Sequence, residues 1–391
     1  MPTLTDVSER AMSIFRDAIV IDTHNDMLTR VLDDGYDPDV RHGALDGHTD
    51  IPRLVESGIT AQFMSAWVDA PYALARPDES FARALRYMDA IHAMIERNRD
   101  TLVLATDAAG IECAKREGKV AILIGVEGGH AIEDSLDNLR ELHRRGARYL
   151  TLTWNNGNSW AGSSIGEHDT RTGGLTPFGE EVIRELDRLR MLVDLSHTSE
   201  ETFYDALAVT RSSVIASHSC ARALSDHPRN LTDDQLRAIA KNGGVAQLNF
   251  FPVFLETRFR EAFESVEADI AARRIAATVA ATVAASGSPT AGSPPAAPDD
   301  LRDLRAAMIA CIPPTPLSIV IDHIDHMVRV AGIDHVGALG SDFDGISATP
   351  SGLEDVTRIP RIVQALLARG YSDSDIKKLL GGNMMRVMME V

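Results

Sequence analysis

Short apolar runs recur along the whole chain, and stretches with the periodicity of amphipathic helices separate most of them. Eight runs predict strands buried on both faces, because Val, Ile and Leu follow one another without alternation. These runs are residues 18–24, 59–67, 120–127, 148–154, 191–197, 213–218, 243–250 and 335–342. The helical patterns between them include 80–97, 134–145, 176–190, 198–209 and 232–242. Alternating strands and helices indicate a parallel sheet, and eight strands favour an α/β fold closed into a (β/α)8 TIM-type barrel.

The segment 255–316 interrupts this alternation, because it contains no strand pattern. Residues 255–286 are rich in Ala, Arg and Glu and predict a helix, as do residues 299–311. Between them, the composition of 286–298 is mainly Ser, Ala, Gly and Pro, which predicts a mobile loop. We interpret the segment as an insertion between strands 7 and 8 of a single domain, 1–391. It could be a lid, a dimer element or a solvated excursion.

Acids and histidines stand at the carboxyl ends of five predicted strands. They are His24, Asp26, Glu127, His197, His218 and Asp342. In a barrel of parallel strands these ends meet at one face, where such barrels carry their active sites. Neutral imidazoles and ionised carboxylates that converge within about 2.0–2.2 Å of a divalent ion form a metal site. Each motif alone would more often be a turn or a salt bridge, but their coincidence at five strand ends predicts a metal centre.

The spacing of these residues is compatible with two ions. His24 and Asp26 are two residues apart in an extended segment, so both side chains point to the same side and suit one ion. Glu127 has two carboxylate oxygens and could bridge two ions. His197 and His218 could then complete the second ion.

Asp342 ends the last predicted strand and suggests an acid/base role. Two metals roughly 3.5–4 Å apart could hold a bridging hydroxide as nucleophile and polarise a carbonyl group. Asp342 would take the proton from that water and pass it to a leaving amine.

The remaining histidines have weaker contexts. His323 and His326 lie three residues apart on a predicted helix, and a solvated, charge-laced helix face is the preferred interpretation. His130 and His168 lie near the predicted site loops and are secondary candidates. We therefore expect none of these four to be a principal ligand.

Composition and charge restrict the class of protein. The chain has 391 residues, of which 44% are hydrophobic and 25% charged, as in ordinary globular proteins. The formal net charge of −18 argues against nucleic acid or anionic membranes as partners. Cys113, Cys220 and Cys311 form no disulfide or metal-binding pattern and are expected to be small buried residues.

The sequence contains no apolar stretch of membrane-spanning length. Residues 1–16 are amphipathic and carry acids, without the apolar core of a secretory signal. A cytoplasmic location is the default expectation, although a chain that had lost a signal peptide would look the same.

Several motifs together carry a resemblance to a known family. They are IDTHND at 21–26, GVEG at 125–128, VDLSH at 193–197, ASHS at 216–219, HPRN at 227–230 and GSDFDG at 340–345. In letters, order and spacing they resemble the membrane dipeptidase (renal dipeptidase) family of zinc peptidases, within the amidohydrolase superfamily of barrels. The resemblance extends from about residue 19 to the GGN at 381–383.

The resemblance implies a binuclear zinc dipeptidase. His24 and Asp26 would bind the first of two zinc ions per chain. His197 and His218 would bind the second, and Glu127 and a hydroxide would bridge the pair. The family also implies a dipeptide substrate, acceptance of a D-amino acid at its C-terminal position, and a homodimer.

Three further residues take roles from the same resemblance. Arg229 would hold the terminal carboxylate of the substrate, a bidentate task that suits the planar guanidinium group. Asp342 would be the acid/base. Trp154 is a departure, because mammalian members carry a histidine at this point, in the fourth strand. An indole offers one donor and a large apolar wall, so the substrate pocket is expected to differ there.

Two alternatives remain open. An N-acyl-D-amino acid deacylase or a related amidohydrolase would keep every ligand, and substrates that lack a free α-amine would distinguish it. A catalytically silent metal-binding protein is the second alternative. Asp342 argues against it, since binding alone needs no proton shuttle.

Overall fold

The computed structural model describes residues 7–43, 46–166, 173–285 and 298–390. All eight predicted strands are present and pair in parallel in the order β1-β2-β4-β5-β6-β7-β8-β9. They are β1 (Ile21–Asp22), β2 (Ala61–Trp67), β4 (Val120–Glu127), β5 (Ala147–Thr151), β6 (Leu192–Asp194), β7 (Ile215–Ala216), β8 (Val245–Gln247) and β9 (Val336–Gly337). Except for β4, the strands are shorter than the apolar runs, since only part of each run joins the ladder.

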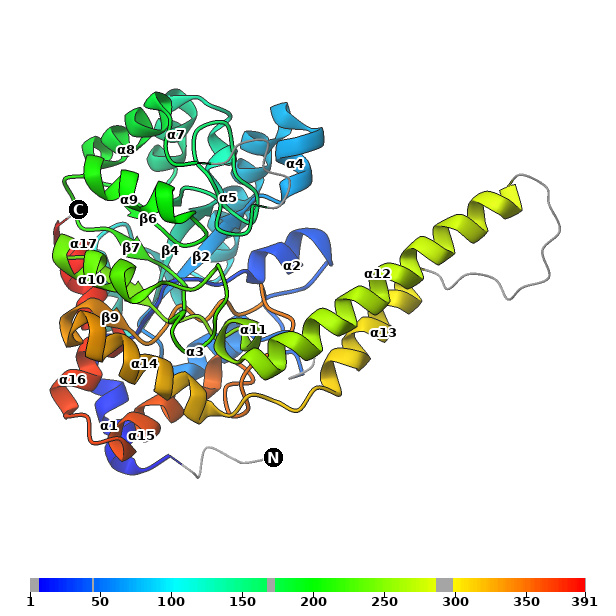
Figure 1. The fold of residues 1–391 in the computed structure, drawn as a ribbon. Helices are drawn as coiled ribbons and strands as arrows, with labels where there is room; N and C mark the ends of the chain where they lie inside the picture. The colour runs from blue at the N-terminus through cyan, green and yellow to red at the C-terminus, as the bar shows by residue number, and fades with distance from the viewer. Residues whose placement is uncertain (1–6, 44–45, 167–172, 286–297, 391) are drawn as a thin grey trace.

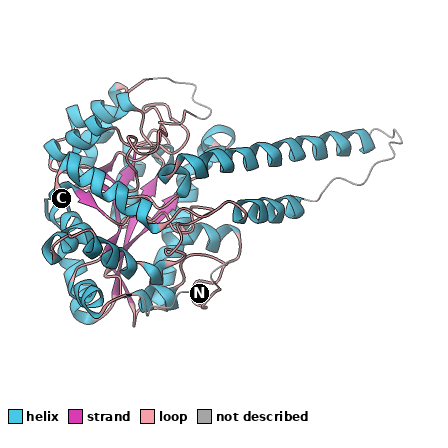
Figure 2. Ribbon diagram, turned by 60° about the horizontal axis from the view of Figure 1, so that its bottom comes forward, coloured by secondary structure: helices cyan, strands magenta, loops and turns pink. Residues whose placement is uncertain are grey.

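The sheet curls into a barrel whose first and last strands join just beyond their paired residues. The Thr23 N–H donates to the Leu339 carbonyl (3.0 Å), and the Asp342 N–H donates to the His24 carbonyl (3.1 Å). Asn25 and Phe343 form a parallel bridge between the same two segments. Helices surround the strands on the outside, as Figure 2 shows. The predicted α/β barrel is therefore confirmed.

A ninth strand was not predicted. β3 (Leu102–Leu104) pairs in parallel with the start of β4, outside the order of the other strands. Its three residues are too short a run to stand out from the preceding helix by periodicity.

The barrel interior differs between its two ends. Alternate residues of the strands, such as Phe63 and Leu123, point inward and form one buried cluster. Met384 and Met388 of α17 (Asn383–Glu390) belong to the same cluster and fill the amino-terminal end. The opposite, carboxyl end is left to the polar strand-end residues.

The predicted helices have the expected positions, and capping residues set their ends. The Thr176 side chain accepts from the Gly179 N–H at the start of α8, while Thr232 and Gln235 form a capping box on α10. α10 ends at Gly243, whose φ of 88° suits glycine. Helices outside the 255–316 segment, besides α17, are α1 (Glu9–Asp17), α2 (Met27–Asp33), α3 (Ile51–Ser57), α4 (Ala70–Ala75), α5 (Ser80–Arg97), α6 (Ala108–Glu117), α7 (Leu136–Arg144), α8 (Pro177–Leu189), α9 (Glu200–Val209), α10 (Asp233–Asn242), α14 (Leu317–Ala331), α15 (Pro360–Ala368) and α16 (Asp373–Lys377).

Between β8 and β9 the chain forms α11 (Pro252–Leu255), α12 (Thr257–Ala285) and α13 (Pro298–Ala310). Helices α12 and α13 lie side by side and project from the barrel as an arm (Figure 1). The helices predicted in this segment are confirmed. The predicted mobile loop 286–298 lies outside the described residues, except for Pro298, which begins α13.

The arm is packed at its base and exposed farther out. Phe259, Val266 and Ile270 of α12 are buried against Ile309 of α13. Farther along α12, Ile275 is 66% exposed and Val279 57%. In the part of the chain that the structure describes, no helix combines the length and the apolar character needed to cross a membrane.

The expectation for the cysteines is correct for one of three. Cys220 is buried, whereas Cys113 and Cys311 are exposed. Cys113 lies on the outer face of α6, and Cys311 follows the last residue of α13, so neither position reaches the core.

Candidate metal centre

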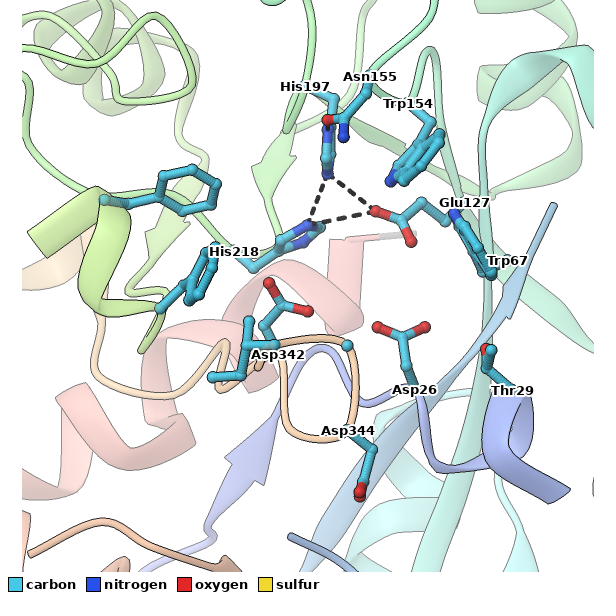
Figure 3. Close-up of a pocket in the computed structure, with 14 residues that line it drawn as sticks. Asp26, Thr29, Trp67, Glu127, Trp154, Asn155, His197, His218, Asp342 and Asp344 are labelled. Carbon is cyan, nitrogen blue, oxygen red and sulfur yellow. Dashed lines mark hydrogen bonds and ion pairs between the residues drawn. The ribbon is translucent and has the colours of Figure 1, made fainter. Parts of the chain in front are cut away.

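The five predicted ligands converge at the carboxyl end of the barrel, with Glu127 at the centre. Figure 3 shows Asp26, Glu127, His197 and His218 of this group. The Glu127 Oε2 atom lies 3.4 Å from His24 Nε2, which in turn lies 3.3 Å from Asp26 Oδ2. The other oxygen, Oε1, lies 2.9 Å from His197 Nε2 and 3.4 Å from His218 Nε2. None of the five residues is more than 7% exposed. Residues that are 194 positions apart in the sequence thus form one compact buried group.

Tight turns after the strands direct these side chains inward. His197 has a φ of 69° and Asp342 a φ of 60°, in the left-handed region that few residues other than glycine adopt. Such strained backbone is concentrated at functional sites. The Asp26 N–H donates to the Phe343 carbonyl (2.9 Å), which ties the turn after β1 to the turn after β9.

The outer ring nitrogen of each histidine has a fixed partner. The Tyr149 hydroxyl donates to the Thr23 carbonyl (3.2 Å), so it accepts from the Nδ1–H of His24 (2.9 Å). His197 Nδ1 lies 3.1 Å from the side-chain oxygen of Asn155, which can only accept. His218 Nδ1 contacts the Ser217 hydroxyl at 2.7 Å. These contacts place the ring proton on Nδ1 and leave a lone pair on Nε2.

The Nε2 lone pairs of His197 and His218 meet the Glu127 carboxylate with no proton donor between them. His197 Nε2 and His218 Nε2 are only 3.0 Å apart. His24 Nε2 and Asp26 Oδ1 are buried atoms without a hydrogen-bond partner among the described residues. Lone pairs at such distances repel one another unless a cation lies among them, so this donor set fits divalent metal ions.

Charge states on the imidazole-rich side match those of metal ligands. Burial alone would raise the pKa of Glu127, but the surrounding imidazoles, His24 foremost, hold that pKa well below its ordinary value. Burial lowers the pKa of His197 to about 3 and that of His218 well below its usual range. An ionised carboxylate and neutral imidazoles are the forms that bind metal.

The other side of the centre is rich in carboxylates. Burial acts to lower the pKa of His24, but Tyr149, Glu127 and Asp26 raise it well above its ordinary value. Burial raises the pKa of Asp26, and it raises that of Asp342 to about 8. His24, Asp26 and Asp342 form one possible ligand group, and His24, Glu127 and His218 form another. A cation would take the place of the protons that this side otherwise holds.

A glycine makes room for the partner of His24. A Cβ atom on Gly125 of β4 would lie 1.9 Å from the Tyr149 ring, so only glycine allows that ring to pass beneath the site. The sequence analysis missed Tyr149 and Asn155 as functional residues. A glycine in the middle of a fully buried strand was an available signal, since it marks a close approach.

A cavity of about 240 Å³ opens onto the centre. It has two aromatic walls, one formed by Trp67 and Trp154, which pack edge to face at 5.0 Å, and the other by Phe251 and Phe254. The remaining lining residues are Asp26, Thr29, Glu127, Asn155, His197, His218, Asp342, Asp344, Gly345 and Ile346. Trp154 thus lies in a cavity wall, and Trp67, which the sequence analysis missed, faces the same cavity.

Arg229 lies beside the centre but is not among the residues that line the cavity. It is 2% exposed, and its Nη1 and Nη2 atoms donate to Ser219 Oγ (2.8 Å) and the His218 carbonyl (2.7 Å). Its Nε atom is buried without a partner among the described residues. The predicted contact of Arg229 with a substrate carboxylate therefore stays a prediction.

Of the four histidines with weaker sequence contexts, the three that the structure describes have partners away from the centre. His323 is buried rather than solvated, because its two ring nitrogens contact the Ala221 N–H (3.1 Å) and the Leu255 carbonyl (3.0 Å). His326 pairs with an aspartate of α10. His130 Nε2 contacts the Val68 carbonyl (2.9 Å), and His168 lies outside the described residues.

Comparisons with known proteins give a family and several similar folds. The profile of the family described as membrane dipeptidase (peptidase family M19) matches residues 8–391. A probable dipeptidase, PvdM, from Pseudomonas aeruginosa is 24% identical, with a TM-score of 0.81 over 99% of each chain. Dipeptidase AC, a metallopeptidase of family M19, is 27% identical, with a TM-score of 0.74 over 95% of this chain and 98% of its own. A metallopeptidase from Rhodobacter sphaeroides, solved with a phosphinate mimic of the dipeptide L-Ala-D-Ala, is 26% identical, with a TM-score of 0.73 over 95% of this chain and 99% of its own.

Proposed function

This chain belongs to the membrane dipeptidase family, and from that premise we propose that it is a binuclear zinc dipeptidase. The observation that carries the proposal is the convergence of three imidazole Nε2 atoms on Glu127, with no proton donor between its carboxylate and His197 or His218. Such a group is costly to bury unless it binds cations. The aromatic cavity above it gives a small substrate access to the same atoms.

We propose ligands for two zinc ions from this donor set. His24 and Asp26 would hold the first, His197 and His218 the second, and Glu127 would be a ligand of both. Zinc bound there would supply a Lewis acid for the scissile carbonyl and for the water molecule that attacks it. The fixed partners of the three imidazoles keep their Nε2 lone pairs directed inward throughout.

Asp342 is the proposed acid/base. Its carboxylate points into the cavity, and its Oδ2 atom accepts from the Asn249 amide (2.8 Å), which fixes its orientation (Figure 3). Burial raises its pKa to about 8, and cations at the centre would lower that value. Asp342 would accept the proton of the attacking water and pass it to the leaving amine.

The substrate is proposed to be a dipeptide that can end in a D-residue. The cavity of about 240 Å³ is below the roughly 300–1,000 Å³ of pockets for drug-sized ligands, which suits a small molecule. The Rhodobacter sphaeroides relative was solved with a mimic of L-Ala-D-Ala. Trp154 would pack against the substrate, and Arg229 would hold its carboxylate through the Nε–H, which has no partner in the part of the chain that the structure describes.

A homodimer, a cytoplasmic location and a single domain are further proposals. Sedimentation of the purified chain against its monomer mass of 42.4 kDa tests the dimer. Cell fractionation tests the location, and a single cooperative unfolding transition tests the domain.

The main experiment measures amino-acid release by zinc-loaded protein. The substrates are matched pairs, L-Xaa-L-Xaa and L-Xaa-D-Xaa, with N-acetyl-D-Xaa alongside. We expect cleavage of both dipeptides and none of the N-acetyl compound. Release from the N-acetyl compound alone would identify a deacylase, and silence on all three would identify a metal-binding protein without activity.

A further inference from the structure

The three histidines of the centre have unlike partners at their outer nitrogens. His24 uses the phenol of Tyr149 and His197 the amide of Asn155, both of them neutral groups. His218 uses the hydroxyl of Ser217, and that hydroxyl also contacts a carboxylate, that of Asp194, at 2.6 Å. Within the described residues, His218 is thus the one histidine of the three whose outer nitrogen is linked to a carboxylate through its hydrogen-bond partner.

Asp194 is a fully buried carboxylate that ends β6. Four donors surround it: the hydroxyl of Thr151 (2.6 Å), the hydroxyl and N–H of Ser217 (2.6 and 2.8 Å), and the N–H of Ser196 (3.1 Å). All four groups donate toward the carboxylate oxygens, so none of them needs a proton on Asp194. No Lys or Arg side chain forms an ion pair with Asp194 among the described residues, so its direct partners are these four donors.

The position of one proton links Asp194 to His218. The Ser217 hydroxyl has a single hydrogen, and an ionised carboxylate at 2.6 Å can only accept it. The Ser217 oxygen must therefore accept from the Nδ1–H of His218 at 2.7 Å. The ring is left with its Nε2 lone pair toward Glu127.

We propose that Asp194 is a positioning residue that acts through Ser217 to fix the Nδ1–H tautomer of His218 and so strengthens the binding of the second metal ion. This inference rests on the proposed function. Asp194 does not touch the cavity, so its effect is on the tautomer and orientation of His218 rather than on the substrate.

Asp22 provides a matched control. It also ends a strand, is fully buried and accepts from a serine of the neighbouring segment, Ser341, through the hydroxyl (2.5 Å) and the N–H (2.9 Å). The only atom of His24 that Asp22 contacts is the backbone N–H (3.3 Å). The His24 ring is held by Tyr149 instead. Asp22→Asn should therefore disturb the fold about as much as Asp194→Asn without acting on an imidazole.

The experiment compares the wild type with Asp194→Asn, Ser217→Ala and Asp22→Asn. The first readout is the tautomer of His218 in metal-free protein, from long-range ¹H–¹⁵N correlations of ¹⁵N-histidine-labelled chain. The amide introduced by Asp194→Asn would donate to Ser217 and turn its hydroxyl proton toward His218 Nδ1. We expect the ring proton of His218 to move to Nε2 in Asp194→Asn. In Ser217→Ala we expect a mixture of the Nδ1–H and Nε2–H tautomers.

The second readout is zinc binding by chelator competition. We expect the affinity for one of two ions to fall about 10–100-fold in Asp194→Asn and Ser217→Ala, with the other ion and Asp22→Asn unchanged. An unchanged tautomer and unchanged affinities in both variants would overturn the proposal, as would an equal loss in Asp22→Asn. If the wild type binds no zinc but the tautomer shifts as expected, Asp194 is confirmed as the residue that fixes the tautomer of His218. The proposed zinc-dependent function is then wrong.

Discussion

The carboxyl face of the barrel and the arm use apolar segments in opposite ways. At the barrel face, apolar strands end in the five proposed ligands, which are at most 7% exposed, and the three histidines among them have partners at their outer ring nitrogens. On the outer part of α12, by contrast, Ile275 and Val279 are exposed to solvent. The regions meet at α11, where Phe251 lines the cavity and packs against Phe263 of α12 (5.5 Å). Geometry is therefore fixed at the centre, and the effect of substitutions should fall from the centre through the cavity wall to the arm.

The largest effect should come from Glu127→Gln. The substitution keeps the size of the side chain but removes the charge that faces all three imidazoles. We expect dipeptidase activity below about 1% of wild type, together with fewer than two zinc ions per chain. Steady-state kinetics and elemental analysis measure the two quantities. Lost activity at full zinc content would restrict Glu127 to a role in the chemical step.

A large loss with a different signature should follow from Asp342→Asn. We expect kcat to fall by about 10²–10⁴, the usual contribution of a general acid/base, while zinc content stays at the wild-type level. Asp344→Asn is the control, because Asp344 has a similar left-handed backbone, with a φ of 66°, but points away from the centre (Figure 3). Unchanged turnover in Asp342→Asn would rule out the acid/base assignment.

An intermediate effect is expected from Phe254→Ala in the cavity wall. Loss of the ring removes apolar contact with the substrate, so KM should rise about tenfold, or about 1.4 kcal/mol, with little change in kcat. Phe263→Ala is the control, since Phe263 belongs to the same aromatic group but does not line the cavity. Equal changes in KM for both variants would mean that the wall acts through the arm as a whole.

The smallest effect is expected from Ile275→Ala on the arm. Because Ile275 is 66% exposed, the free energy of unfolding should change by less than about 0.5 kcal/mol. Ile270, about one turn earlier on α12, is only 1% exposed. Ile270→Ala should therefore lower the free energy of unfolding by about 2–5 kcal/mol. Urea titration of both variants gives the comparison. A loss above about 1 kcal/mol for Ile275→Ala would indicate that another chain covers this face in solution.

The barrel and its polar rim could be predicted because both are local properties of the sequence. A strand such as β4 shows as a continuous apolar run, and the residue that ends it, Glu127, falls at the rim by topology alone. Trp67 ends β2 in the same way. The same rule therefore points to Trp67, although an indole neither titrates nor binds metal and so was not among the predicted site residues.

The supporting residues could not be predicted from local patterns. The contact of Tyr149 with His24 joins positions 125 residues apart, and its direction depends on the twist of the barrel. The burial of His323 depends on the carbonyl of Leu255, to which no sequence pattern points. The arm was predicted as helices, but its projection from the barrel depends on packing at its base.

The close fit of Gly125 against Tyr149 restricts the order in which these two positions can change. Tyr149 can be shortened while Gly125 stays, at the cost of the partner that orients His24. The reverse step is blocked, since a methyl group at Gly125 would overlap the tyrosine ring. Any mutational route to a larger residue in the middle of β4 must therefore first pass through a variant whose His24 has lost its phenol partner.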